Sequence, residues 1–125
     1  MDDTVADTLQ HHLNWYKNEF GITLSKEMLR GKKIYDVVLK EHLNTVHSFP
    51  HHPDFFRDLN VIENAVEVIY ELSKKYEIYF ASAAMEYPSS FNAKYDWLKF
   101  QTIGFHSVCN NEVVAHSMKI TCFCI

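Results

Sequence analysis

The hydroxyl group of Ser82 stands where α/β proteins commonly carry a functional side chain. Residues 78–80 favour a strand, and the small residues 81–84 interrupt it. Pro88 and Ser89 then introduce an amphipathic helix. Open α/β sheets present their sites at the carboxyl ends of strands, in the loops that lead into helices. The sequence therefore predicts an anion site formed by the Ser82 hydroxyl and nearby loop amides.

Other polar residues give weaker signals when they are considered one at a time. Asp2 and Asp3 at a chain end, and Lys94 within a helical segment, are most simply solvated charges. Two histidine pairs suggest a metal site. However, adjacent histidines on a helix point apart and no third ligand is evident, so no structural zinc is expected. The pairs are His11-His12 and His51-His52.

Length and composition indicate one small domain. The chain has 125 residues, of which 47% are hydrophobic, and its formal net charge is −4. This charge gives no reason to expect a nucleic-acid polymer as partner. No apolar run approaches the roughly 20 residues of a membrane span, and the first residues do not resemble a signal peptide. The three cysteines have no zinc-site spacing, so a reduced, cytoplasmic protein without a membrane is expected.

Helical periodicity dominates the first 60 residues. A helix is predicted from Thr8, with Leu9, Leu13, Tyr16 and Phe20 on one face, and Gly21 is expected to end it. A short helix is predicted after Ser25, and a longer one from Ile34 to about Val46. The two prolines within residues 49–53 break the pattern, and residues 54–59 follow as a turn or a short helix.

The second half reads as helix, strand and helix. Residues 63–76, 77–82 and 89–100 are predicted to form these elements, as part of a repeating βα architecture. The expected buried faces are formed by Ala65, Val68, Ile69, Leu72 and Tyr76 in the first helix, and by Phe91, Tyr95, Trp97 and Leu98 in the second. From residue 102 onward no helical period is evident, and weak strands at 112–115 and 119–123 are possible.

Three separated segments together resemble the 5′(3′)-deoxyribonucleotidases of the haloacid dehalogenase (HAD) superfamily: MDDTVADT, HHPDFFRDLNVIENAVEVIYEL and IYFASAAMEYPSSFNAKYDWL. The first resembles the family's Asp-Met-Asp-x-Val-x-Ala-Asp-Thr pattern at the end of the first strand. The third resembles the second motif strand, with its Thr/Ser, and the following helix with Lys-Tyr-x-Trp. The match covers roughly residues 1–100 in the expected order and spacing.

This resemblance implies an α/β fold with a HAD-like Rossmann-type core and a small helical cap insertion. The whole chain, residues 1–125, would be a single domain. The cap would span roughly residues 16–60, the core 61–101 and a divergent tail 102–125. The core is expected to be incomplete, because the first strand and the late motifs of the family are missing from the sequence.

The resemblance also implies a reaction, the Mg²⁺-dependent dephosphorylation of deoxynucleoside monophosphates. In the family an aspartate attacks the phosphate to form an aspartyl-phosphate, and a second aspartate two residues later serves as acid and base. Asp2 matches the second aspartate, and its backbone carbonyl matches a Mg²⁺ ligand. Ser82, Ala83 and Lys94 match phosphate-binding positions. The aromatics that match the nucleoside pocket are Phe55 and Phe56.

Two departures from the family pattern affect the expected activity. The nucleophile would stand just before Met1, and the late Asp-Asp motif is not found after Gln101. The chain as it stands is therefore expected to be inactive, although its family is a phosphatase family. A non-catalytic nucleotide-binding remnant and an unstable pseudogene product are the alternatives. Phe55 and Phe56 could equally be core residues. Two adjacent aromatics on a helix cannot both face one core, however, so one of them could face a ligand cleft.

Overall fold

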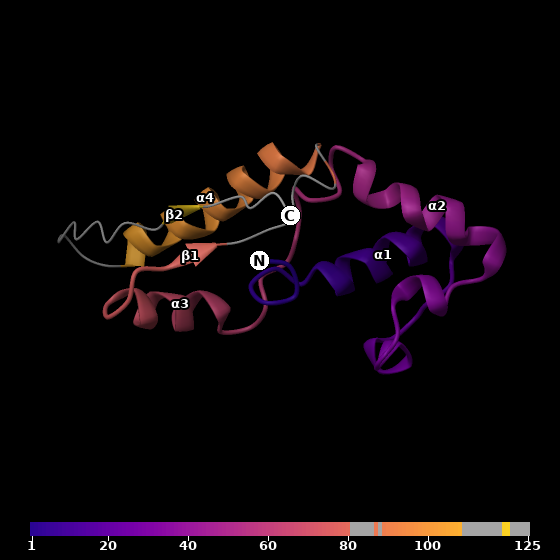
Figure 1. Cartoon of the computed structure of the whole chain (residues 1–125), viewed down its shortest axis with the longest axis horizontal. Helices are drawn as coiled ribbons and strands as arrows, with labels where there is room; N and C mark the ends of the chain where they lie inside the picture. Colours follow the sequence, from indigo (N-terminus) through magenta and orange to yellow (C-terminus); the bar gives the residue numbers. More distant parts are fainter. Residues whose placement is uncertain (81–86, 88, 109–118, 121–125) are drawn as a thin grey trace.

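The computed structural model of the chain describes residues 1–80, 87, 89–108 and 119–120. It is elongated, and the N-terminus lies near its middle (Figure 1). One end holds α1 and α2 with several short 3₁₀ segments, and the other end holds α3, α4 and a pair of strands. The α-helices are α1 (Thr8–Phe20), α2 (Leu43–Ser48), α3 (Ala65–Ser73) and α4 (Ser90–Val108). The strands are β1 (Tyr79–Phe80) and β2 (Lys119–Ile120).

Helix α1 begins and ends where the sequence predicts. The Asp7 carboxylate accepts a hydrogen bond from the Gln10 backbone N–H (3.1 Å) and so caps the first turn. Leu13 and Tyr16 are buried on the predicted face. Gly21 ends the helix in the left-handed conformation (φ 69°), and its N–H donates to the Lys17 carbonyl.

The predicted helix from Ile34 to Val46 is wrong. The segment contains two 3₁₀ turns, Ile34–Asp36 and Lys40–His42, and only then α2. The Asp36 carboxylate accepts a hydrogen bond from the Lys33 N–H (2.8 Å), and Leu39 has an extended backbone. The Asp36 contact caps the first turn, and the extended backbone of Leu39 is what interrupts the helix. The short helix predicted after Ser25 is a 3₁₀ helix, Lys26–Leu29, and a further 3₁₀ turn covers Phe49–His51.

Residues 54–59 form turns, which agrees with the prediction. The turn allows Phe55 and Phe56 to lie in the core together, which a helix would not. Phe55 and Phe56 are both buried, with 1% and 4% of their surfaces exposed. The restriction on adjacent aromatics applies to a helix, and a turn can direct both rings inward. The chain after this turn pairs with the N-terminal loop, since the Ile62 N–H donates to the Val5 carbonyl (2.8 Å).

Helix α3 is confirmed as an element, but its predicted buried face is largely wrong. Val68 and Leu72 are 54% and 43% exposed, and Tyr76 beyond the helix is also exposed. Of the predicted face, Ala65 and Ile69 do pack against the core. Helical periodicity identifies an apolar face, but it does not identify the surface that covers this face.

Helix α4 is longer than predicted, and only part of its predicted buried face is buried. It extends to Val108, so the expectation of no helix after residue 102 is wrong for its first residues. Phe91 and Tyr95 are exposed. Trp97 and Leu98 are buried as predicted, and the other buried residues are Ser90, Ala93 and Lys94.

Strands β1 and β2 are parallel, with Tyr79 opposite Lys119 and Phe80 opposite Ile120. In Figure 1, β1 runs between α3 and α4, an arrangement that agrees with an α/β class. The described residues are nevertheless mainly helical and do not form a complete Rossmann-type core. The predicted strand at 119–123 is described only at β2, and the one at 112–115 lies outside the described residues.

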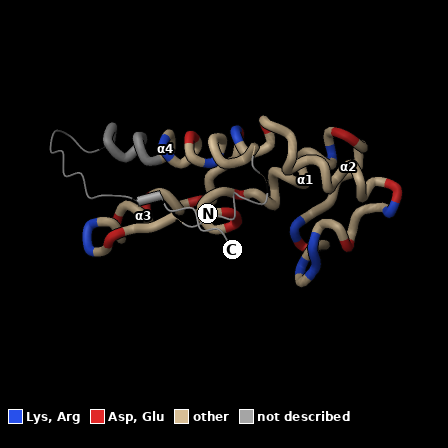
Figure 2. The backbone as a smooth tube through the Cα atoms, turned by 45° about the horizontal axis from the view of Figure 1, so that its top comes forward, with Lys and Arg blue, Asp and Glu red and all other residues tan. Residues whose placement is uncertain are grey.

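Charged residues of both signs are spread along the chain. Basic residues gather in the segment 30–33, and elsewhere they are interspersed with acidic residues (Figure 2). Across the part of the chain that the structure describes, no helix combines the length and the apolar character needed to cross a membrane.

Candidate functional site

The N-terminal loop and helix α4 bring two predicted site residues into contact. The Lys94 ammonium donates a hydrogen bond to the Asp2 carboxylate, with Nζ 3.0 Å from Oδ2. The two residues are 92 positions apart in the sequence. Only 7% of the Lys94 side chain is exposed, compared with 33% of the Asp2 side chain. The pair therefore forms a charged site with a buried cation and a partly accessible carboxylate.

Hydrogen bonds hold the N-terminal loop in place around Asp2. The Thr8 hydroxyl donates to Asp2 Oδ1 (3.2 Å), and the Lys94 ammonium donates to the other carboxylate oxygen, Oδ2. The Asp3 carboxylate accepts the Leu9 N–H (2.8 Å), and the Asp3 N–H donates to the Ala6 carbonyl (2.8 Å). These contacts fix the position of Asp2 relative to the first turn of α1.

The rotation of α4 is fixed one turn beyond Lys94. The Trp97 indole N–H donates to the Leu59 carbonyl (2.8 Å) in the buried interface with the 54–59 turn. Residues three apart on a helix lie on the same face, so this hydrogen bond also determines the direction in which Lys94 points. A buried ammonium requires a compensating partner, and the Asp2 carboxylate provides one.

The two phenylalanines have different neighbours. The Phe56 ring lies under the Lys94 ammonium, with Nζ 4.3 Å from the ring centroid. The Phe55 ring contacts His11, His12 and Trp15 of α1, with centroid separations of 5.1, 5.2 and 5.2 Å. Phe56 therefore belongs to the Asp2–Lys94 site, whereas Phe55 joins the aromatic packing of α1.

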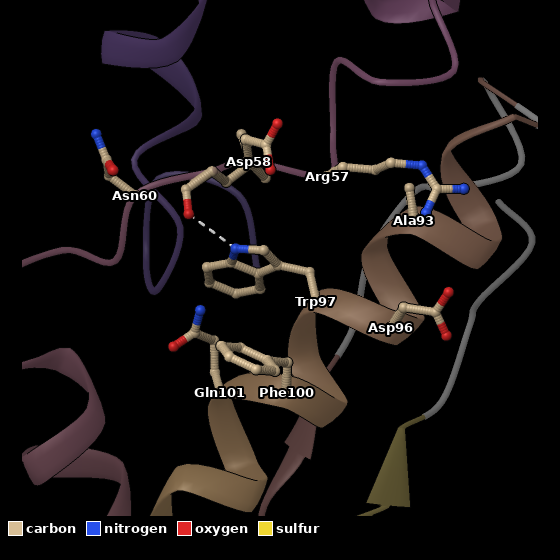
Figure 3. A pocket seen from close by; sticks show the side chains of 9 residues that line it. Arg57, Asp58, Asn60, Ala93, Asp96, Trp97, Phe100 and Gln101 are labelled. Carbon is tan, nitrogen blue, oxygen red and sulfur yellow. Dashed lines mark hydrogen bonds between the residues drawn. The ribbon is translucent and has the colours of Figure 1, made fainter.

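An open pocket of about 530 Å³ lies beside this site, between the 57–60 segment and α4. Trp97 lies at its centre, and the side chains of Arg57 and Asp96 extend together on one side (Figure 3). Charges of both signs line the pocket, so its electrostatics do not select an anion. This pocket is not predicted from the sequence. Of the residues that line it, the sequence singles out only Trp97, as part of the buried face of its helix.

Ser82 and Ala83, the other predicted phosphate-binding residues, lie outside the described residues. The structure therefore brings Asp2, Lys94 and Phe56 together and leaves the predicted anion loop untested. Lys94 has the least obvious sequence signal, because a lysine in an amphipathic helix normally faces solvent.

The described residues do not form a complete magnesium site. Among them, no three His, Cys, Asp or Glu side chains converge in a way that could hold a metal ion. The Asp2 main-chain oxygen is the kind of hard donor that Mg²⁺ prefers, and the Thr4 hydroxyl lies 3.4 Å from it. It would supply a single ligand.

The histidines of α1 are part of the packing. His12 Nε2 lies 3.3 Å from the Val46 carbonyl oxygen, and burial lowers the pKa of His12 to about 4. Burial also lowers the pKa of His11, although the Asp58 carboxylate acts in the opposite direction. Both rings make edge contacts with Phe55, so a neutral, structural form is favoured at neutral pH.

Comparison with known proteins identifies the class to which this arrangement belongs. Residues 1–120 match the family described as 5′ nucleotidase, deoxy (pyrimidine), cytosolic type C protein (NT5C). The chain belongs to this family of HAD-like deoxynucleotidases, and the family implies a HAD-like fold.

Individual relatives agree with this assignment. The chain is 37% identical over 103 residues to the 5′(3′)-deoxyribonucleotidases of Bacillus subtilis and of Bacillus phage SPbeta. It is 39% identical over 98 residues to a Staphylococcus epidermidis protein that is provisionally named as the same enzyme. These matches cover 78% of this chain and 54–55% of the relatives. The chain thus spans about half the length of the curated relatives it matches.

Proposed function

We propose that the protein acts in the dephosphorylation of deoxynucleoside monophosphates, as a hydrolase of the 5′(3′)-deoxyribonucleotidase type. The names of its relatives support this reaction. The observation that carries the proposal is the contact between Asp2 and Lys94, because it joins a carboxylate and a buried cation from two separate matching segments. Phosphoryl transfer depends mainly on such positioning and on charge neutralisation.

The two charged residues would have distinct roles. The Lys94 ammonium binds a phosphate oxygen. When no phosphate is bound, the Asp2 carboxylate accepts a hydrogen bond from the ammonium, and a bound phosphate shares this task. In the family's reaction a nucleophilic aspartate bonds to phosphorus as the nucleoside oxygen leaves. Asp2 would give a proton to that leaving oxygen and would later accept one from the water that hydrolyses the aspartyl-phosphate. The Thr8 hydroxyl, 3.2 Å from Asp2 Oδ1, keeps the carboxyl group oriented for both steps.

Other parts of the proposal rest on the resemblance. Ser82 and Ala83 would bind the remaining phosphate oxygens. The resemblance also matches Phe55 and Phe56 to aromatics of the nucleoside pocket, but Phe55 packs against His11, His12 and Trp15 of α1, and we do not assign it to nucleotide binding. Both rings are buried, so a base would require rearrangement to reach either face. Mg²⁺ would neutralise phosphate charge, with the Asp2 carbonyl as one ligand. The helical cap would correspond to the α1–α2 end, which Figure 1 shows apart from α3 and α4.

Nucleotide binding tests the role of Lys94. Replacing Lys94 by methionine keeps most of the side-chain volume and removes the charge, so the affinity for dUMP should fall about tenfold or more. Isothermal titration calorimetry on the 125-residue chain measures this directly. Lys99→Met is the matched control, since Lys99 is an exposed lysine on the same helix. Equal affinities of Lys94→Met and wild type would contradict the phosphate-binding role.

Phosphate release in the presence of Mg²⁺ separates binding from turnover. For the 125-residue chain by itself we expect binding without turnover, because the position of the family's nucleophile lies outside these residues. The Bacillus subtilis enzyme provides the positive control. Release at a comparable rate would overturn this expectation and leave the assignment of Lys94 intact.

A further inference from the structure

The contact between Phe56 and Lys94 gives the phenylalanine a function different from nucleoside stacking. The Lys94 Nζ atom lies 4.3 Å from the Phe56 ring centroid, well within the range of a cation–π interaction. Both groups are almost completely buried, with 4% of Phe56 and 7% of the Lys94 side chain exposed. Burial removes competing water and strengthens the attraction between the ammonium and the ring.

The Phe56 ring is itself held in a fixed orientation. Phe55 packs against it edge to face, with ring centroids 4.9 Å apart and planes at 81°. Tyr87, which follows the predicted anion loop, contacts it from another direction at 6.2 Å. The ring can therefore act as a rigid surface for the long and flexible lysine side chain.

The Asp2 carboxylate and the Phe56 ring restrain the ammonium in different ways. The carboxylate oxygen accepts a hydrogen bond from Nζ, whereas a ring face attracts the charge without providing a second negative charge. A second carboxylate would repel an incoming phosphate, but a phenyl ring does not. An aromatic residue therefore suits a cation that must bind an anion.

We propose that Phe56 is a positioning residue for Lys94, and that its ring holds the ammonium where a phosphate group of the nucleotide binds. This inference rests on the function proposed above and assigns Phe56 to the phosphate side of the site. The ring orders the lysine before the ligand arrives, so less conformational entropy is lost on binding.

Phe55 provides a matched control within the chain. It is the neighbouring residue, it has the same side chain, and it is at least as deeply buried. Its ring contacts His11, His12 and Trp15 of α1. Replacement of either phenylalanine by leucine removes similar packing, and only replacement of Phe56 removes the contact with Lys94.

The experiment compares Phe56→Leu, Phe55→Leu and Phe56→Tyr in the 125-residue chain. We expect Phe56→Leu to raise the Kd for dUMP by about two- to tenfold, the cost of ordering one long side chain. Phe56→Tyr keeps the ring face and should bind dUMP with an affinity close to that of the wild-type chain. Phe55→Leu should keep the affinity within about twofold of wild type while lowering thermal stability to a similar extent as Phe56→Leu.

A spectroscopic readout accompanies the binding measurement. The ε-methylene protons of Lys94 should show an upfield ring-current shift in the NMR spectrum of the wild-type chain. That shift should be lost in Phe56→Leu and retained in Phe55→Leu and Phe56→Tyr. It reports on the contact without any nucleotide, and a shift that Phe56→Leu does not change would overturn the contact itself.

The outcomes distinguish this inference from the proposed function. Suppose that the wild-type chain binds dUMP. If Phe55→Leu and Phe56→Leu then reduce the affinity equally, or if Phe56→Leu does not reduce it, the positioning role is wrong. The phosphate site stands in both cases. If the wild-type chain binds neither dUMP nor inorganic phosphate, the proposed function fails and the positioning role fails with it, even when the ring-current shift is present.

Discussion

At the scale of single residues, the clearest feature is a lysine on the buried face of a helix. Lys94 is three and four residues before Trp97 and Leu98, so all three lie on one side of α4. The predicted buried face combined Phe91 and Tyr95 with Trp97 and Leu98, because aromatic residues occur on both sides of the helix. Periodicity alone could not choose between the two faces, and the resemblance alone singled out Lys94.

The buried histidine of α1 leads to a prediction about pH. The ordinary pKa of His12 is 6.5, and burial lowers it to about 4 in the folded chain. Between these values the unfolded chain binds more protons, so stability should fall as the pH falls from about 6.5 to 4. The expected loss is on the order of 3 kcal/mol.

Urea unfolding at several pH values checks this expectation. His12→Leu should flatten the dependence, and a smaller slope should remain because the pKa of His11 is lowered in the same direction. An unchanged slope in His12→Leu would show that the titration of His12 is not the cause.

At the scale of elements, predictions succeeded where local interactions decide the structure. Asp7 and Gly21 stand at the two ends of α1, and each makes a hydrogen bond to a residue in the adjoining turn, Gln10 and Lys17. The predicted helix is confirmed. The predicted helix from Ile34 to Val46 is interrupted at Leu39, whose backbone is extended between two 3₁₀ turns. A hydrophobic period does not show where the backbone leaves the helical conformation.

Gly21 permits a test of the helix stop. Its φ of 69° is costly for any residue with a Cβ atom, and an added Cβ would meet no other atom within 4 Å. Gly21→Ala should therefore lower the free energy of unfolding by about 1 kcal/mol through backbone strain alone. Asn18→Ala, at an exposed position within α1, should be neutral or slightly stabilising. Chemical denaturation of both variants measures the difference.

At the scale of the whole molecule, sequence reasoning identified the elements better than their packing. The apolar face of α3 was expected in the core, but Val68 and Leu72 are largely exposed. Which face is covered depends on residues far away in the sequence, and a local pattern does not contain that information. For the same reason, the site could be assembled from the sequence only through the resemblance, which supplied Asp2 and Lys94 together.

A pair of leucines tests this packing. Leu13 is 2% exposed and Leu72 is 43% exposed, so truncation should affect them differently. Leu13→Ala should lower the free energy of unfolding by about 2–5 kcal/mol, and Leu72→Ala should change it by about 0.5 kcal/mol or less. Urea denaturation curves give both values. Equal losses would mean that Leu72 is buried in solution.

The link between Asp2 and Lys94 also has a consequence for the order of folding. It closes a loop of 92 residues, and loop closure of that length costs conformational entropy that one ion pair offsets only weakly. We therefore expect the pair to form late, after α1 and the aromatic core have assembled. A nucleotide bound at Lys94 would then recognise only the completed fold and would stabilise it by mass action.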